Sequence, residues 1–243
     1  MHLDGLFLTF VGVVVAATAA AALRYVPREY RRGFLIGFGA WVAFATVLGA
    51  GGILADLTLR PPGVVYVFIP TVALIAFLAR SQTGAVIASS IPVAALVGAE
   101  SLRAVVELFL ERLWHAGRLP EMLTFHGANF DILIGLSAPV VAVLYARHAL
   151  GARTALVWNV VGIASLANVV VRNVLTSPAI HLISTEVPTS AVGSFPYSFI
   201  PALIVPLALV LHVLAIRSLA TLRKPAGEPF GSRSGRGGKA VAS

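Results

Sequence analysis

Seven long stretches of the sequence are apolar and free of charged residues, and polar stretches separate them. The charge-free windows run over 5–23, 33–55, 61–79, 81–99, 132–146, 154–171 and 187–216. An α-helix needs about 20 apolar residues to cross roughly 30 Å of hydrocarbon, and most of the windows reach or approach that length. The pattern therefore predicts an all-α, polytopic membrane protein built as a bundle of seven transmembrane helices.

The windows and their polar flanks give approximate bounds for each membrane span. Arg147 is expected to extend the short fifth helix by reaching towards the interface, and Pro201 and Pro206 are expected to bend the seventh. The expected transmembrane domain covers 1–222, and the Gly-, Ser- and Arg-rich segment 223–243 is expected to be a disordered, basic cytoplasmic tail. The expected spans are 5–23, 33–55, 61–79, 84–106, 130–147, 154–175 and 195–217.

The basic residues between the windows are distributed unequally over the two sides of the expected bundle. Only Arg60 and Arg118 lie in loops on one side, whereas the other side and the tail carry thirteen. The positive-inside rule then places the N-terminus outside and the C-terminus in the cytoplasm, which predicts a multi-pass protein of the plasma (inner) membrane. The thirteen are Arg24, Arg28, Arg31, Arg32, Arg80, Arg147, Arg153, Arg217, Arg223, Lys224, Arg233, Arg236 and Lys239.

Composition supports a membrane location and excludes several other classes. Hydrophobic residues make up 58% of the chain, charged residues 12%, and the mean hydropathy is +0.91, whereas soluble domains carry about 25% charged residues. The net charge of +8 does not indicate nucleic acid, because the basic residues flank apolar segments as membrane anchors do. The expected partner is the lipid bilayer. The absence of cysteine excludes a disulfide-linked partner and thiolate metal ligands.

The fourth window continues into a helix with one charged face. We expect a single helix over 84–115, in which Glu100, Arg103, Glu107, Glu111 and His115 fall within a sector of about 120°. The first two should lie near the outer membrane boundary and the last two beyond it. Spacings of four residues allow Arg103 to pair with Glu107, and Glu111 with His115.

Other polar residues are expected at the same outer ends of the helices. Arg172 has no acidic neighbour in sequence, and because a buried arginine needs a partner, we expect it to pair with Glu100, Glu107 or Asp131. His212 lies deep in the seventh span and is expected to be a hydrogen-bonded core residue. The candidate ligand-binding site or ionic network comprises Glu100, Arg103, Glu107, Glu111, Asn129, Asp131, Asn168 and Arg172.

The sequence assigns no catalytic residue, metal ligand or cofactor. No His-Glu-x-x-His motif is present, and a single deep histidine does not favour haem held across helices. No Gly-x-Ser-x-Gly motif indicates a serine nucleophile. Both lysines, Lys224 and Lys239, lie in the tail, which excludes a retinal Schiff base within the membrane.

Two segments carry a resemblance to known sequences. The residues from Arg103 to Glu107 and the run 119–133, together with Phe195-Pro-Tyr197, Pro201, Pro206 and His212, resemble a group of multi-pass bacterial membrane proteins. The resemblance implies a multi-pass membrane fold and no particular activity.

The clustered polar residues favour one function and leave two alternatives open. The favoured function is binding of a small molecule or ion, for transport or sensing, through an outward-facing polar pocket. One alternative is a membrane-embedded enzyme acting at the outer leaflet, with paired carboxylates as acid and base. The other is an accessory or assembly subunit whose charges pair only with one another and with a partner.

Overall fold

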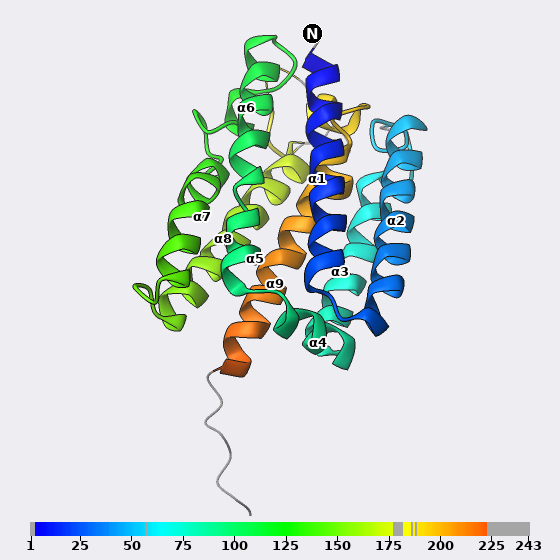
Figure 1. Ribbon diagram of the computed structural model, residues 1–243. Helices are drawn as coiled ribbons and strands as arrows, with labels where there is room; N and C mark the ends of the chain where they lie inside the picture. Colours follow the sequence, from blue (N-terminus) through cyan, green and yellow to red (C-terminus); the bar gives the residue numbers. More distant parts are fainter. Residues whose placement is uncertain (1–2, 57, 177–181, 186, 188, 223–243) are drawn as a thin grey trace, which may run out of the picture.

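The computed structural model describes residues 3–56, 58–176, 182–185, 187 and 189–222, and this part of the chain is helical, without β-strands. The expected tail, 223–243, lies outside the described residues. Within these residues, nine α-helices form a bundle in which α1 begins at one end and α9 finishes at the other (Figure 1). Their bounds are α1 Leu3–Tyr25, α2 Arg28–Ala50, α3 Val64–Arg80, α4 Gln82–Ser90, α5 Val93–Ala99, α6 Leu102–His115, α7 Asp131–Ala146, α8 Ala152–Leu175 and α9 Val205–Leu222.

In the described part of the chain, four helices are long and apolar enough to cross a membrane, which suggests a membrane protein. They are α1, α2, α8 and the helix Ile200–Thr221, which includes most of α9. A fifth candidate is the pair α3 and α4, which bends by 78° at Ser81. The Ser81 Oγ accepts a hydrogen bond from the Gly84 N–H at 3.0 Å and so caps the new helix.

The helix expected over 84–115 is divided into three pieces. Because Pro92 disfavours helical backbone at the residue before it, Ile91 is extended and α4 ends at Ser90. The chain restarts as α5 at Val93 and continues into α6 through 3₁₀-type hydrogen bonds, among them Arg103 N–H to Glu100 C=O at 3.0 Å. The long continuous element is therefore α5 followed by α6, and α4 lies beyond the N-terminal end of α5 (Figure 1).

The centre of the bundle is α9, which packs against α3, α4, α5 and α8. It begins as a short π-helix, Ile200–Ile204, because Pro206 has no N–H to donate to the Ala202 carbonyl four residues earlier. The Trp41 Nε1–H of α2 donates to that carbonyl at 2.9 Å. The Ala202 carbonyl, which the proline leaves without its helical donor, thus receives a hydrogen bond from a neighbouring helix.

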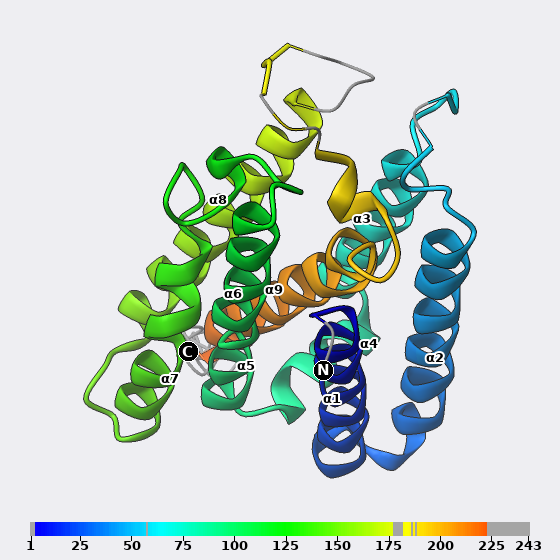
Figure 2. The ribbon, with the colours of Figure 1, turned by 90° about the horizontal axis from the view of Figure 1, so that it is seen from above.

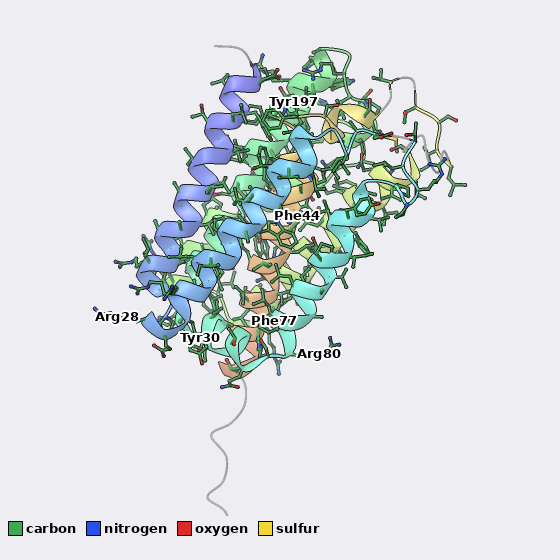
Figure 3. The ribbon with its side chains drawn as sticks, turned by 90° about the vertical axis from the view of Figure 1, so that its right-hand side faces the viewer. Arg28, Tyr30, Phe44, Phe77, Arg80 and Tyr197 are labelled. Atoms are coloured by element: carbon green, nitrogen blue, oxygen red, sulfur yellow. The ribbon has the colours of Figure 1, made fainter. Side chains whose placement is uncertain are left out.

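An aromatic cluster joins α1 to the rest of the bundle near the start of α1. The Phe7 ring lies 5.0 Å from Phe109 in an edge-to-face arrangement and 4.9 Å from Tyr197. The Tyr197 hydroxyl donates to Asp4 at 2.7 Å. Figure 3 shows Tyr197 at this end of the bundle and Arg28 and Arg80 at the opposite end.

Close approach of helices at two glycines positions the polar residues described below. A Cβ at Gly135 of α7 would lie 2.3 Å from the Ala104 backbone nitrogen of α6. A Cβ at Gly162 of α8 would lie 2.3 Å from the His212 ring of α9. Only glycine allows these backbones and rings to come so close. As a result α6, α7, α8 and α9 meet around a single point.

Candidate functional site

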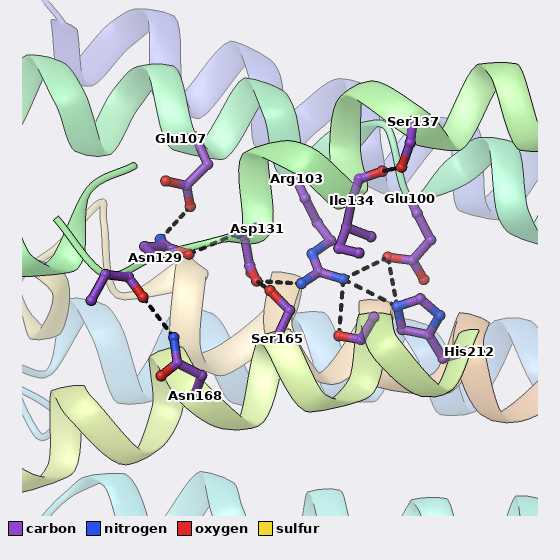
Figure 4. Close-up of polar contacts among 12 residues, drawn as sticks. Glu100, Arg103, Glu107, Asn129, Asp131, Ile134, Ser137, Ser165, Asn168 and His212 are labelled. Atoms are coloured by element: carbon purple, nitrogen blue, oxygen red, sulfur yellow. Dashed lines mark hydrogen bonds and ion pairs between the residues drawn. The ribbon is translucent and has the colours of Figure 1, made fainter. Parts of the chain in front are cut away.

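Arg103 lies at the point where these helices meet, and its side chain is almost fully buried (Figure 4). One terminal nitrogen, Nη2, donates to the Asp131 carboxylate at the start of α7. The other, Nη1, donates to the Gly162 carbonyl of α8 at 3.2 Å and contacts the His212 Nε2 of α9 at 3.1 Å. One guanidinium therefore holds three helices to α6.

The hydrogen bonds around His212 determine which of its ring nitrogens carries a proton. The Asn159 Nδ2 donates to the Ala155 carbonyl at 2.8 Å, so its Oδ1 is the atom that faces the His212 Nδ1, 2.9 Å away. The Nδ1 must then donate, and in a neutral imidazole the Nε2 is left as an acceptor. Arg103 donates to that acceptor. His212 is thus a neutral ring that is hydrogen-bonded on both sides.

Glu100 completes this side of the cluster but makes no hydrogen bond of its own. Its side chain is fully buried, and its Oε2 lies 3.5 Å from the His212 Nε2 and 3.9 Å from the Arg103 Nη1. Among the described residues, neither carboxylate oxygen has a hydrogen-bond partner. A buried carboxylate without hydrogen bonds is costly, so Glu100 is the least satisfied group of the cluster.

On the other side of Arg103, Asn129 connects two further carboxyl groups. Its Nδ2 donates to the Glu107 Oε1 at 2.6 Å, and its Oδ1 accepts from the Asp131 N–H at 3.0 Å. The Ser165 hydroxyl of α8 also donates to the Asp131 carboxylate. The second Glu107 oxygen, Oε2, has no partner within the described part of the chain.

These residues form what we call the buried network: Glu100, Arg103, Glu107, Asn129, Asp131, Asn159, Ser165 and His212. It contains three carboxyl groups and one guanidinium, all at most 6% exposed. With every carboxyl group ionised and His212 neutral, the network would hold two more negative than positive charges. Unpaired charge in a low-dielectric interior costs several kcal/mol, which favours uptake of a positive charge.

The space beside the network is small. Arg103, Glu107 and Asp131 line a cavity of about 30 Å³. A water molecule needs roughly 10–15 Å³ of such volume, so the cavity has room for a water molecule or two and not for a small organic molecule. Of the eight residues expected at the site, these three line the cavity.

Three of the eight sequence-predicted residues lie outside the buried network. Glu111 lies one turn beyond Glu107, and its Oε1 is 3.1 Å from the His115 Nε2 and 3.0 Å from the His126 Nε2. The contact with His115 confirms the expected Glu111–His115 pair. The Asn168 Nδ2 of α8 donates to the Ala128 carbonyl at 2.7 Å, and Arg172 donates to Asn168. Glu111 and Asn168 thus both contact the loop that precedes α7.

The two predicted pairings of arginine are wrong. Arg172 has no carboxylate within 4.0 Å among the described residues, and its Nε donates to Asn168 at 2.9 Å. Arg172 lies on the last turn of α8, about two turns beyond Ser165. The Asp131 carboxylate is instead paired with Arg103. Arg103 does not pair with Glu107 either, because Asn129 takes that carboxylate and Arg103 reaches across to α7.

The depth predicted for Glu100 and Arg103 also differs from the structure. They were expected at the outer boundary, yet Arg103 contacts the middle of α8 and α9 through Gly162 and His212. The reason is the break at Pro92. Glu100 lies seven residues from the start of α5, about 10 Å along the helix axis, instead of sixteen residues from a helix start at Gly84.

Sequence reasoning missed the contributions of α8 and assigned His212 only to the core. The hydrogen bond of His212 to Asn159 confirms the core assignment, but its contact with Arg103 makes it part of the site. Asn159, Gly162 and Ser165 recur every three residues along α8. That spacing places small and polar side chains on one face of a helix. It is the feature of the sequence that could have indicated the part of α8 in the site. Within the described residues, no group of three or more His, Asp or Glu side chains could hold a metal ion.

Fold and site together define a class: an all-helical protein, with helices apolar enough for a membrane, that encloses a charged network. A family model described as Domain of unknown function (DUF8737) matches residues 61–220, and the chain belongs to this family. All residues of the buried network fall within the matched segment. No curated protein matches the chain, and no solved structure does.

Proposed function

We propose that the chain is a multi-pass protein of the plasma membrane that binds and releases a proton at its buried network, for transport or sensing. The network needs a positive charge, and the cavity beside it has only about 30 Å³. A proton meets both conditions, because it adds charge and requires no space. The bound ion is therefore a proton.

One observation carries the proposal: the position of Glu100. Its carboxyl group is fully buried, lies within 4.0 Å of both Arg103 and His212, and has no hydrogen-bond partner among the described residues. As a carboxylate it would add uncompensated negative charge to the network. As a neutral acid it removes that charge and gains a proton to donate. Ionisable groups at membrane depth commonly mark proton pathways.

Two of the expected functions are less well supported by the geometry. An enzyme needs room for its substrate next to the acid and base, and the cavity holds only water-sized groups. An accessory subunit would need its charges only for pairing with one another. The oxygens of Glu100 and Glu107 that lack partners within the described residues favour proton binding over that function.

The arrangement of the helices supports the proposed seven spans and their orientation. One continuous element is formed by α5 and α6 together, and a second is α7. Both run beside the four long helices and α3 (Figures 1 and 2), which makes seven crossings. Arg28 and Arg80 lie at the same end of the bundle (Figure 3), as the positive-inside rule requires of a cytoplasmic end. The proposed orientation has the N-terminus outside and the C-terminus in the cytoplasm.

Proton counting in detergent solution tests the proposed function. We expect the wild-type protein to retain one proton in the network at neutral pH, and Glu100→Gln to lack it, so that the titration curves differ by one proton near neutrality. Glu121→Gln is the control, because Glu121 is exposed and lies outside the buried network, so its curve should match wild type near neutral pH. A Glu100→Gln curve that also matches wild type near neutral pH would contradict the proposal.

A further inference from the structure

A groove on the side of the bundle leads towards the buried network. It lies between α3, α8 and the start of α9 and has a volume of about 290 Å³. Figure 2 shows α3 and α8 standing apart, with α9 passing between them. The side chains that line the groove are almost all apolar, such as Phe68, Val72 and Ile163. In a membrane such a groove is open to the acyl chains of the bilayer.

The groove adjoins the cavity beside the buried network. The two spaces have five lining residues in common, contributed by α6, α8 and the region where the π-helix meets α9. The groove therefore meets the cavity lined by Arg103, Glu107 and Asp131 at these shared side chains. The shared residues are Leu110, Leu166, Val169, Ile200 and Val205.

Two polar atoms of the side chains that line the cavity have no partner within the described residues. They are the Glu107 Oε2, an acceptor, and the Arg103 Nε, a donor. Both side chains are 2% exposed. Buried donors and acceptors normally have partners, so this donor and this acceptor together suit a group that can both donate and accept. A hydroxyl group is such a group.

Size and charge restrict the chemistry of that group further. A cavity of about 30 Å³ accommodates one or two water-sized groups, which excludes a phosphate or sugar head group. A carboxylate would add negative charge to a network that already contains three carboxyl groups. A neutral hydroxyl group meets both limits, and the apolar groove provides the place for a chain that carries it.

We infer that the groove between α3 and α8 admits the alkyl chain of a membrane-soluble alcohol, whose hydroxyl group binds Glu107 and Arg103 in the cavity. The ligand accepts a hydrogen bond from the Arg103 Nε and donates one to the Glu107 Oε2. This inference rests on the proposed function because it uses the same network, and it assigns that network a lipid-like alcohol as its ligand. Access is sideways from the bilayer rather than from the outer aqueous side.

Photolabelling of the protein in liposomes tests the inference with two matched probes. One probe is a long-chain fatty alcohol that carries a diazirine, and the other is the alkane of equal length with the same diazirine. The alcohol should label residues 163–174 of α8 saturably, and unlabelled fatty alcohol should compete with it. It should also bind about tenfold more tightly than the alkane, as expected for hydrogen bonds to charged groups.

Two tryptophan variants on α8 test the position of the ligand. Val171 is 52% exposed and lines the groove, whereas Val161 is 50% exposed and is not among the groove residues. Val171→Trp should abolish the saturable labelling, and Val161→Trp should retain it. Circular dichroism and gel filtration of both variants establish that they fold alike.

Three results would overturn the inference. The first is equal labelling by alcohol and alkane, which would indicate boundary lipid only. The second is labelling by the alcohol that does not saturate. The third is unchanged labelling of Val171→Trp. The proton titration of Glu100→Gln is measured without any amphiphile. Failure of the proposed function therefore appears in the titration, and failure of the ligand inference appears in the labelling.

Discussion

At the scale of residues, Arg103 connects the buried network. It contacts Asp131, Gly162 and His212 on three other helices, and Glu100 at the junction of α5 and α6. A planar guanidinium presents several donors in fixed directions, which is why one arginine serves all four. Without it, three buried carboxyl groups would face one another with no cation.

Replacement of Arg103 should strongly destabilise the protein. We expect Arg103→Leu to lower the free energy of unfolding by about 3–5 kcal/mol, because removal of one partner leaves the other buried charges uncompensated. Chemical denaturation in detergent micelles gives the measurement. Arg112→Leu serves as the control: Arg112 is on the same helix and exposed, and its loss should change the value by less than about 0.5 kcal/mol. Equal effects of the two variants would refute the central role of Arg103.

The residues of the site divide into those that the sequence could and could not identify. Glu100, Arg103, Glu107 and Asp131 stand out because charge is rare in an apolar chain. His212 and Asn159 do not stand out by charge, and the three-residue spacing of Asn159, Gly162 and Ser165 gives a face of α8 without showing what that face contacts. Arg172 was given the wrong partner for a related reason: its height along α8 relative to α7 is set by packing, which no periodicity reveals.

At the scale of elements, helix breaks and glycine contacts set the depth of the network. Hydropathy predicted the four helices that are long and apolar enough to cross a membrane, α1, α2, α8 and the helix that includes α9. It did not predict that Pro92 would end α4 and shift Glu100 towards the middle of the bundle. Nor did it predict that α7 would begin beside Arg103, which depends on the close approach of Gly135 to Ala104.

A methyl group at Gly162 should disturb the network through His212. In Gly162→Ala the new Cβ would lie 2.3 Å from the His212 ring, so the ring or α8 must move. We expect a loss of about 1–3 kcal/mol in the free energy of unfolding, the usual cost of overpacking. Gly12→Ala, in the middle of α1 with open space around it, should cost nothing and even stabilise its helix. Thermal unfolding of both variants in detergent compares them, and a neutral Gly162→Ala would contradict this packing.

At the scale of the whole molecule, the proposed topology can be tested because the chain has no cysteine. Single cysteines introduced at Ala116 and Ala149, both exposed, probe the loops at opposite ends of the bundle. In intact cells a membrane-impermeant maleimide should label Ala116→Cys and leave Ala149→Cys unlabelled, and permeabilised cells should show labelling of both. Reversed labelling would invert the proposed orientation, and labelling of both in intact cells would contradict seven spans.

The direct test of the central claim is infrared spectroscopy of the buried network at neutral pH. A protonated carboxyl group has a carbonyl stretch that a carboxylate lacks, and the band shifts when the proton is exchanged for deuterium. We expect wild-type protein to show this band, Glu121→Gln to retain it, and Glu100→Gln to lose or diminish it. A wild-type spectrum without the band at neutral pH would show that the network is fully ionised and would contradict proton binding.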